Sequence, residues 1–251
     1  MTQTRARQRR PHHAARTPVW LFDLDNTLHG ASHAIFPAIN VAMTQYIVDT
    51  LGVSHDVADH LRTSYTLRYG AALLGLTRHH PVDPHDFLKV VHTFPDLRAM
   101  LVAERGLART IAALPGRKIV LTNAPEAYAR AVLAELGIER LFERVVAIEH
   151  MRTRRTNGDW RAKPDRAMLR ATLRRAGASL SDAILIEDTR GHLKRYRPLG
   201  IQTVWITGHL PEHALTMRAG RSGRPHYVDH RIRSLKSLQT GLQSGRLRQT
   251  G

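Results

Sequence analysis

The sequence contains no cysteine, and this absence excludes a disulfide-stapled scaffold and any metal site built from thiolates. Acidic residues are scarce, with 21 Asp and Glu against 38 Lys and Arg. No apolar run approaches the ~20 residues that a membrane span needs. The first residues are basic, and no apolar stretch of signal-peptide length follows them. We therefore expect a cytoplasmic protein without an export signal or a membrane segment.

The charge balance is strongly positive, with a formal net charge of +17. Only five of the 38 basic residues are lysine, a bias that the codon composition of a GC-rich genome also explains. Residues 1–17 hold five Arg and no acid, and five further basic residues lie within 231–251. We interpret these two segments as a disordered basic tail and a basic C-terminal tail. A nucleic acid or another polyanion is the less favoured partner, because no recognised nucleic-acid-binding motif is present.

Short apolar runs rich in Val and Ile recur along the chain and predict buried strands. They lie at 18–25, 118–123, 144–149, 183–188 and 201–207. Helical patterns separate several of them, for example at 126–138 and 164–179, where a proline starts and a glycine ends the pattern. This alternation predicts an α/β fold, a Rossmann-like parallel sheet with helices on both faces.

One long interval contains only helical patterns. It follows the first strand and predicts an inserted helical cap over residues 34–95. The core then comprises residues 18–33 and 96–230. In an open parallel sheet, ligands bind outside the carboxyl ends of the strands. The insertion follows the end of the first strand, so we expect the cap to cover the site as a lid.

Polar residues collect where the predicted strands end, or in the loops that follow. These residues are Asp23, Asp25, Thr27, Thr122, Asn123, Lys163, Glu187 and Asp188. The ends of parallel strands point the same way, so these side chains are expected to meet in one crevice. Carboxylates with a hydroxyl, an amide and an ammonium suit phosphoryl transfer to a carboxylate. Mg²⁺ prefers oxygen ligands and would offset the repulsion between Asp23 and Asp25.

The same motifs carry a family resemblance. The sequences DLDNTL (23–28), LTNAP (121–125), KPD (163–165) and LIEDTRGHL (185–193) occur in the order typical of the haloacid dehalogenase superfamily of phosphohydrolases. The likeness covers the core from about residue 18 to residue 207. It implies a Mg²⁺-dependent phosphomonoester hydrolase that forms an aspartyl-phosphate intermediate.

The resemblance also implies a role for each motif residue. Asp23 matches the nucleophile and Asp25 the general acid and base. Thr122 matches the hydroxyl that binds the phosphoryl group, with Asn123 assisting, and Lys163 matches the lysine that pairs with both. Asp188 matches a magnesium ligand, together with Asp23 and the backbone carbonyl of Asp25. Glu187 is either a direct ligand or lies behind the ligands.

The cap resembles that of the pyrimidine 5′-nucleotidase group. The matching residues are Tyr65, Tyr69, Gly70, Gly75 and Leu76. The spacing of Tyr65 and Tyr69 puts both rings on one helical face, which either packs in the core or stacks on a base across a crevice. We take both as candidates for substrate binding. Of the neighbouring polar residues, Thr27 is expected to stabilise a turn, whereas His29 and His33 are loop residues or contacts to substrate.

The expected substrate is a small phosphorylated molecule, preferably a pyrimidine nucleoside 5′-monophosphate. A small sugar phosphate or phosphoglycolate is the first alternative, since only the cap discriminates between them. A polyanion-binding protein on a phosphatase-like core is the second. Before Lys163 lies an unusually basic stretch that contains four arginines, Arg152, Arg154, Arg155 and Arg161. It is interpreted either as a flap that attracts anions or as a surface loop.

Overall fold

The computed structural model describes residues 17–152, 159–212, 214, 225–243 and 247. Its centre is one six-stranded sheet in the order β3-β2-β1-β4-β5-β6, in which every pair is parallel. The strands are β1 (Val19–Phe22), β2 (Arg117–Leu121), β3 (Arg144–Val146), β4 (Ala183–Glu187), β5 (Gln202–Ile206) and β6 (His230–Ile232). The predicted parallel α/β fold is confirmed.

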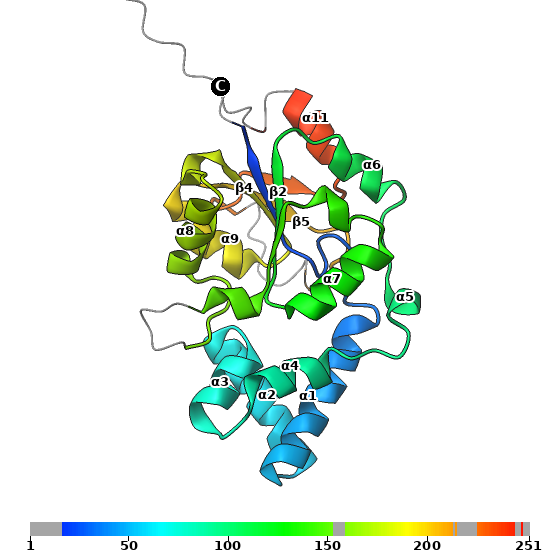
Figure 1. Ribbon diagram of the computed structural model, residues 1–251, viewed down its shortest axis with the longest axis vertical. Helices are drawn as coiled ribbons and strands as arrows, with labels where there is room; N and C mark the ends of the chain where they lie inside the picture. Colours follow the sequence, from blue (N-terminus) through cyan, green and yellow to red (C-terminus); the bar gives the residue numbers. More distant parts are fainter. Residues whose placement is uncertain (1–16, 153–158, 213, 215–224, 244–246, 248–251) are drawn as a thin grey trace, which may run out of the picture.

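Helices cover both faces of this sheet (Figure 1). One face carries α6 (Leu107–Ala112), α7 (Glu126–Glu135) and α11 (Ser237–Gln243), and the other carries α8 (Arg166–Arg175) and α9 (Arg190–Tyr196). Successive strand residues point to opposite faces, so Trp20 and Phe22 enter the first core whereas Val19 and Leu21 enter the second. The unbroken apolar runs of the sequence therefore become strands that are buried on both sides.

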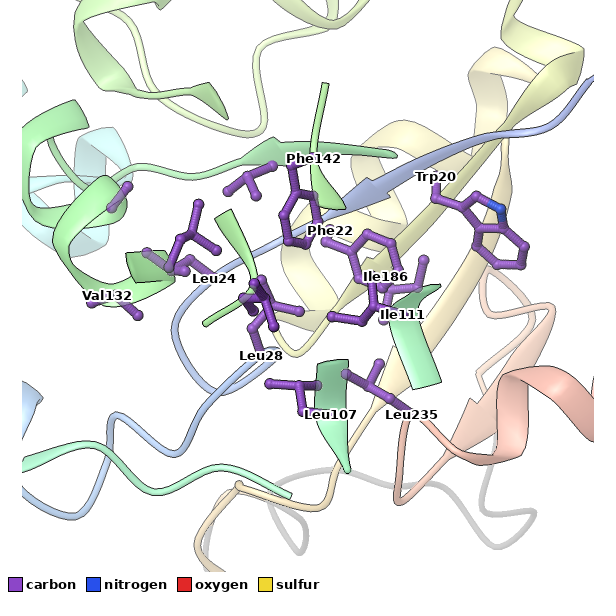
Figure 2. Close-up of a cluster of buried hydrophobic side chains, with 14 of the residues drawn as sticks. Trp20, Phe22, Leu24, Leu28, Leu107, Ile111, Val132, Phe142, Ile186 and Leu235 are labelled. Atoms are coloured by element: carbon purple, nitrogen blue, oxygen red, sulfur yellow. The ribbon is translucent and has the colours of Figure 1, made fainter. Parts of the chain in front are cut away.

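The larger of the two cores surrounds the end of β1. Figure 2 shows Phe22, Leu24, Leu28 and Phe142 packed together among residues from α6 and α7. The rings of Phe22 and Phe142 meet edge to face with centroids 5.8 Å apart. The loop after β1 is thus anchored by buried Leu24 and Leu28, which hold the intervening polar residues at the sheet edge.

The segment between β1 and β2 is helical. Helices α1 (Ile35–Leu51), α2 (His55–Tyr69), α3 (Ala72–His79) and α4 (Pro84–Val91) lie together beyond the carboxyl ends of the strands (Figure 1). The short α5 (Leu97–Met100) leads back to the core. Local signals set the cap boundaries: Gly52 ends α1 in the left-handed region, Ser54 caps α2, and Asp83 caps α4 with Pro84 behind it.

The C-terminal segment differs from the expected basic tail. Residues 231–251 were interpreted as a tail, yet β6 extends the sheet by pairing with β5, and α11 packs on it. Leu235, Leu238 and Leu242 are buried in the larger core. These leucines follow an apolar spacing of three and four, typical of a helix that packs on a core, although only Lys236 between them is basic. The N-terminal tail lies outside the described residues, apart from Thr17. None of the helices in the described ranges is both long and apolar enough to cross a membrane.

Candidate active site

The expected polar residues of the core do meet at the carboxyl ends of the strands. Asp23 follows β1, Thr122 and Asn123 follow β2, Glu187 ends β4 and Asp188 follows it. Lys163 reaches the same place from the loop before α8. Pairing of β1 with both β2 and β4 brings these chain segments together.

Lys163 joins two of the carboxylates. Its Nζ atom donates to Asp23 Oδ1 at 2.5 Å and to Glu187 Oε2 at 2.9 Å, and all three side chains are buried. The other oxygen of Asp23, Oδ2, accepts a hydrogen bond from Thr27 Oγ1 at 3.0 Å. Thr27, expected as a turn residue, therefore also holds the Asp23 side chain. Glu187 Oε2 also lies 3.1 Å from His192 Nδ1, and Oε1 accepts from Thr189 N.

This arrangement shifts the pKa values in opposite directions. Burial and the nearby Glu187 carboxylate raise the pKa of Asp23 to about 6, although Lys163 opposes the shift. Burial acts the same way on Glu187, but the charges of Lys163 and His192 outweigh it and hold the pKa of Glu187 well below its usual value. Burial lowers the pKa of Lys163, yet the two carboxylates raise it above its usual value. At neutral pH the site therefore contains two buried anions and one cation.

Asp188 adds a further carboxyl group, which has no cationic partner of its own in the described ranges. Its carboxyl group accepts hydrogen bonds from Asn26 Nδ2 at 3.4 Å and from Thr189 Oγ1 at 3.0 Å, and it lies beside the Glu187 carboxylate. Burial, Glu187 and Asp23 raise the pKa of Asp188 well above its usual value. Oxygen atoms of Asp23, Glu187 and Asp188 all lie within 4.8 Å of one another. This donor set of hard oxygen ligands with excess negative charge fits a divalent cation.

Asp25 has a separate environment from Asp23. Its Oδ1 atom accepts hydrogen bonds from the hydroxyl of Tyr128 at 2.7 Å and from His29 Nε2 at 3.0 Å. Burial raises the pKa of Asp25, but the bonds from His29 and Tyr128 outweigh it and lower the pKa below its usual value. The Asp25 side chain does not join the carboxylate cluster around Lys163. Asp25 can therefore contribute to a metal site only through its backbone carbonyl.

Thr122 and Asn123, the two residues after β2, form hydrogen bonds to backbone groups of neighbouring loops. Thr122 Oγ1 accepts a hydrogen bond from Ala124 N, which leaves its proton free to donate. Asn123 spans to the loop of Lys163: its Oδ1 accepts from Lys163 N at 2.7 Å and its Nδ2 donates to Lys163 O at 3.3 Å. Asn123, predicted to bind substrate, thus fixes the lysine backbone although it also lines the crevice.

A crevice of about 760 Å³ separates this cluster from the cap. Its floor is polar and contains Asp23, Asp25, Thr122, Lys163 and Asp188. Its cap wall is mostly apolar and is lined by Phe36, Ile39, Met43, Leu67, Leu73, Phe87 and Leu88. Leu67 is 82% exposed, a high value for a leucine. A ligand in this crevice would place a polar or anionic end on the core and an apolar part against the cap.

Tyr65 and Tyr69 do not line this crevice. Their rings do share one face of α2, as their spacing predicted, with centroids 5.9 Å apart. That face packs on α3: the Tyr65 hydroxyl pairs with His80 Nε2 at 2.9 Å and the Tyr69 hydroxyl with His79 Nε2 at 2.7 Å. The crevice therefore gives no support to the predicted substrate contacts of Tyr65 and Tyr69, because this face of α2 packs against α3 whereas Leu67 lines the crevice.

Several site residues were missed or undervalued in the sequence. The sequence pattern did not indicate Tyr128, the third residue of α7, and it predicted a loop residue or a substrate contact for His29, which is fully buried. Asn26 has a positive φ of 60° and its side-chain oxygen accepts from the backbone of Ala31 and Ser32, so it shapes the loop. His29 lies four residues after Asp25, so the sequence contained a signal for their contact. No sequence signal linked Asp25 to Tyr128 in α7. His33 is exposed.

The basic stretch before Lys163 is only partly described, since residues 153–158 lie outside the described ranges. Arg161 forms an ion pair with Asp165, and the guanidinium of Arg152 lies over the Trp160 ring at 5.1 Å. These contacts hold both arginines on the protein surface. The two central arginines, Arg154 and Arg155, belong to the part that is not described.

Known proteins resemble this chain in sequence and in fold. Phosphate metabolism protein 8 of Saccharomyces cerevisiae is 25% identical over 195 residues, which cover 73% of this chain and 59% of that protein. The chain thus spans about three fifths of this curated relative's length. A solved HAD phosphatase from Thermococcus onnurineus has a TM-score of 0.60 at 19% identity, covering 92% of this chain and all of that one.

A further solved structure is the magnesium-bound hydrolase YfnB of Bacillus subtilis, with a TM-score of 0.54 at 15% identity, covering 90% of this chain and 99% of that one. At these identities the two structures establish the fold. The sequence pattern of the haloacid dehalogenase-like hydrolase family matches residues 19–193, well over half of the chain and every polar strand end described above. The chain belongs to the haloacid dehalogenase-like hydrolases.

Proposed function

We propose that this protein is a Mg²⁺-dependent phosphatase that forms an aspartyl-phosphate on Asp23. The observation that carries the proposal is the pairing of Asp23 with Lys163 beside Asp188, at the polar floor of a crevice. A carboxylate held by an ammonium is oriented for in-line attack, and the same ammonium offsets the charge of the incoming phosphoryl group. The match to the haloacid dehalogenase-like hydrolase family and the likeness in fold to the phosphatase of Thermococcus onnurineus support this reaction class.

The reaction then follows in two steps. An oxygen of Asp23 forms a bond to phosphorus while the bond to the leaving oxygen breaks, and Asp25 supplies the proton that this oxygen needs. Asp25 next takes a proton from water, whose oxygen attacks phosphorus, so that inorganic phosphate leaves and the Asp23 carboxylate is restored. Thr122 donates its free hydroxyl proton to a phosphoryl oxygen. Asp23, Asp188 and the Asp25 carbonyl would hold the magnesium ion, which when bound shields the phosphate from these carboxylates. Glu187 holds Lys163.

The decisive experiment replaces the nucleophile. Asp23→Asn keeps the size of the side chain but removes the attacking anion, so release of phosphate from 4-nitrophenyl phosphate should fall by at least ~10³-fold. Asp86→Asn is the matched control, because Asp86 accepts a hydrogen bond from Tyr46 within the cap and does not line the crevice. Most of the wild-type rate in Asp23→Asn would show that another group is the nucleophile.

The preferred substrate is a pyrimidine nucleoside 5′-monophosphate. The apolar cap wall, rather than Tyr65 and Tyr69, supports this preference, because an apolar wall suits the face of a base better than a hydroxylated sugar. The polar groups of the wall already have partners within the cap: Asn40 Oδ1 accepts from Arg62, and the Thr66 hydroxyl donates to the Arg62 carbonyl. Few groups remain there to bind the hydroxyls of a sugar phosphate or the carboxylate of phosphoglycolate.

A panel of substrates tests this preference. We expect kcat/KM to be higher for pyrimidine nucleoside 5′-monophosphates than for purine nucleotides, hexose phosphates and phosphoglycolate. Leu67→Gln should lower kcat/KM for the nucleotides about 10-fold and leave inorganic phosphate inhibition unchanged, because it places a polar group in the apolar wall. The highest kcat/KM for a hexose phosphate would support the alternative substrate class.

The high net charge motivates the second alternative, a polyanion-binding protein. Salt-dependent nucleic-acid binding with no turnover of any phosphomonoester would favour this alternative.

A further inference from the structure

Two side chains from different elements hold one oxygen of Asp25. Tyr128 of α7 donates its hydroxyl proton at 2.7 Å and His29, from the loop after β1, places Nε2 at 3.0 Å, both on Oδ1. Within the described ranges, no hydrogen bond reaches Oδ2 of this carboxylate. Bonds to a charged acceptor are among the stronger hydrogen bonds in proteins. The pair therefore fixes the rotation of the carboxylate and leaves its second oxygen for the crevice that Asp25 lines.

The ring of Tyr128 is itself held by the chain that returns from the cap. We call residues 92–96, between α4 and α5, the return segment. The ring of Tyr128 is buried and lies 5.4 Å from the ring of His92 and 5.6 Å from that of Phe94, measured between centroids. His92 is anchored in turn, since its Nδ1 lies 2.9 Å from the carbonyl of Leu88 in α4. A continuous set of contacts thus leads from the cap to Asp25.

We propose that Tyr128 is a positioning residue that aims Asp25 at the leaving oxygen and is held in place by the return segment. The inference rests on the proposed acid and base role of Asp25. In that step the phosphorus–oxygen bond breaks and the proton moves from Asp25 to the departing oxygen. Without the Tyr128 hydroxyl, the carboxylate keeps only the bond to His29 and rotates more freely. Transfer of the proton then requires a rarer orientation.

The consequence depends on the leaving group. An alkoxide or a phenoxide is a poor leaving group and needs the proton as the bond breaks, whereas 4-nitrophenolate leaves unprotonated. A poorly oriented Asp25 carboxyl group should therefore slow only substrates whose leaving group is an alkoxide or a phenoxide. A general structural defect would slow both kinds alike.

The test compares Tyr128→Phe with Tyr46→Phe. Each variant removes one tyrosine hydroxyl that donates to an aspartate, Asp25 in the first and Asp86 in the cap in the second. The measured quantity is kcat/KM, which reports every step up to departure of the leaving group. For phenyl phosphate and for an alkyl phosphate we expect Tyr128→Phe to lose roughly 10- to 100-fold, the effect of one hydrogen bond to a charged group. For 4-nitrophenyl phosphate we expect a change below about 3-fold, and for Tyr46→Phe no dependence on the leaving group.

A second variant tests the return segment. Phe94→Leu keeps an apolar side chain but removes the ring contact with Tyr128. It should show the same dependence on the leaving group with a smaller loss, while inhibition by inorganic phosphate stays at the wild-type level. An equal loss on all substrates in Tyr128→Phe, or no loss on any, would overturn the inference. Failure of the proposed function itself appears elsewhere, as wild-type protein without turnover or as an active Asp23→Asn variant.

Discussion

Single residues at this site owe their properties to neighbours rather than to their own chemistry. Asp23 and Asp25 are the same residue type two positions apart, yet burial and Glu187 raise the pKa of the first, whereas His29 and Tyr128 lower that of the second. Like charge raises the pKa of a carboxylate, so an arriving phosphate dianion acts against this lowering. Two carboxylates with distinct surroundings are what a nucleophile and a proton-transfer group require.

The same reasoning predicts a pH effect at His92. Burial lowers the pKa of this ring to about 4, against 6.5 for an unperturbed histidine. Between these values the unfolded chain binds a proton that the folded protein excludes, so the contribution of His92 to the free energy of unfolding is complete above pH 6.5 and is lost as the pH falls to 4. The loss amounts to about 3 kcal/mol.

Urea unfolding between pH 4 and pH 7 measures this contribution. His92→Gln, which keeps a donor for the Leu88 carbonyl, should show a shallower fall of the unfolding free energy with acid than the wild type. His60→Gln, on the exposed side of α2, is the control and should follow the wild-type slope. Identical slopes for all three proteins would mean that His92 is protonated in the folded state.

At the scale of helices, the Tyr65 and Gly75 motif is a packing device. A methyl group placed on Gly75 would lie 2.2 Å from Cγ of Tyr65, so α2 and α3 approach this closely only because α3 has a glycine there. The motif that resembles a nucleotidase cap therefore explains the geometry of the cap, and its tyrosines bond to His79 and His80 instead of facing the crevice.

Gly75→Ala should lower the free energy of unfolding by about 1–3 kcal/mol, because the added methyl group must push the two helices apart. Gly191→Ala is the matched control: this glycine is also helical, in α9, and an added methyl group meets nothing within 4 Å. That change should be neutral or stabilising, since alanine has the higher helix propensity. Thermal unfolding of both variants distinguishes the cases, and equal stability would contradict the close packing of α2 on α3.

At the scale of the whole molecule, the crevice is formed jointly by the sheet core and the helical cap. The sheet supplies the acids, Thr122 and Lys163, and the inserted helices supply the apolar wall. The charge that the sheet concentrates is costly without a cation, since burial and two neighbouring carboxylates raise the pKa of Asp188. Binding of a divalent ion should therefore stabilise the entire fold by linkage.

Thermal unfolding with increasing MgCl₂ tests this coupling without reference to activity. The wild type should gain about 2.7 kcal/mol when magnesium reaches 100 times its dissociation constant. Asp188→Asn should lose most of this gain, whereas Asp86→Asn should retain it. Activity should likewise disappear with EDTA and return with Mg²⁺. A thermal unfolding midpoint of the wild type that does not change with magnesium would count against a metal at Asp23 and Asp188.

Patterns local to the chain determined the strands, the inserted helices and the polar strand ends. Apolar runs of strand length report burial on both sheet faces, and parallel strands align their carboxyl ends, so Asp23, Thr122, Lys163 and Asp188 were expected to meet and do. Only the tertiary structure decided which face of α2 meets the crevice, that Tyr128 reaches Asp25 across 103 positions, and that β6 joins the sheet. Helical periodicity specifies which residues share a face but not what that face contacts, because that depends on how distant elements pack.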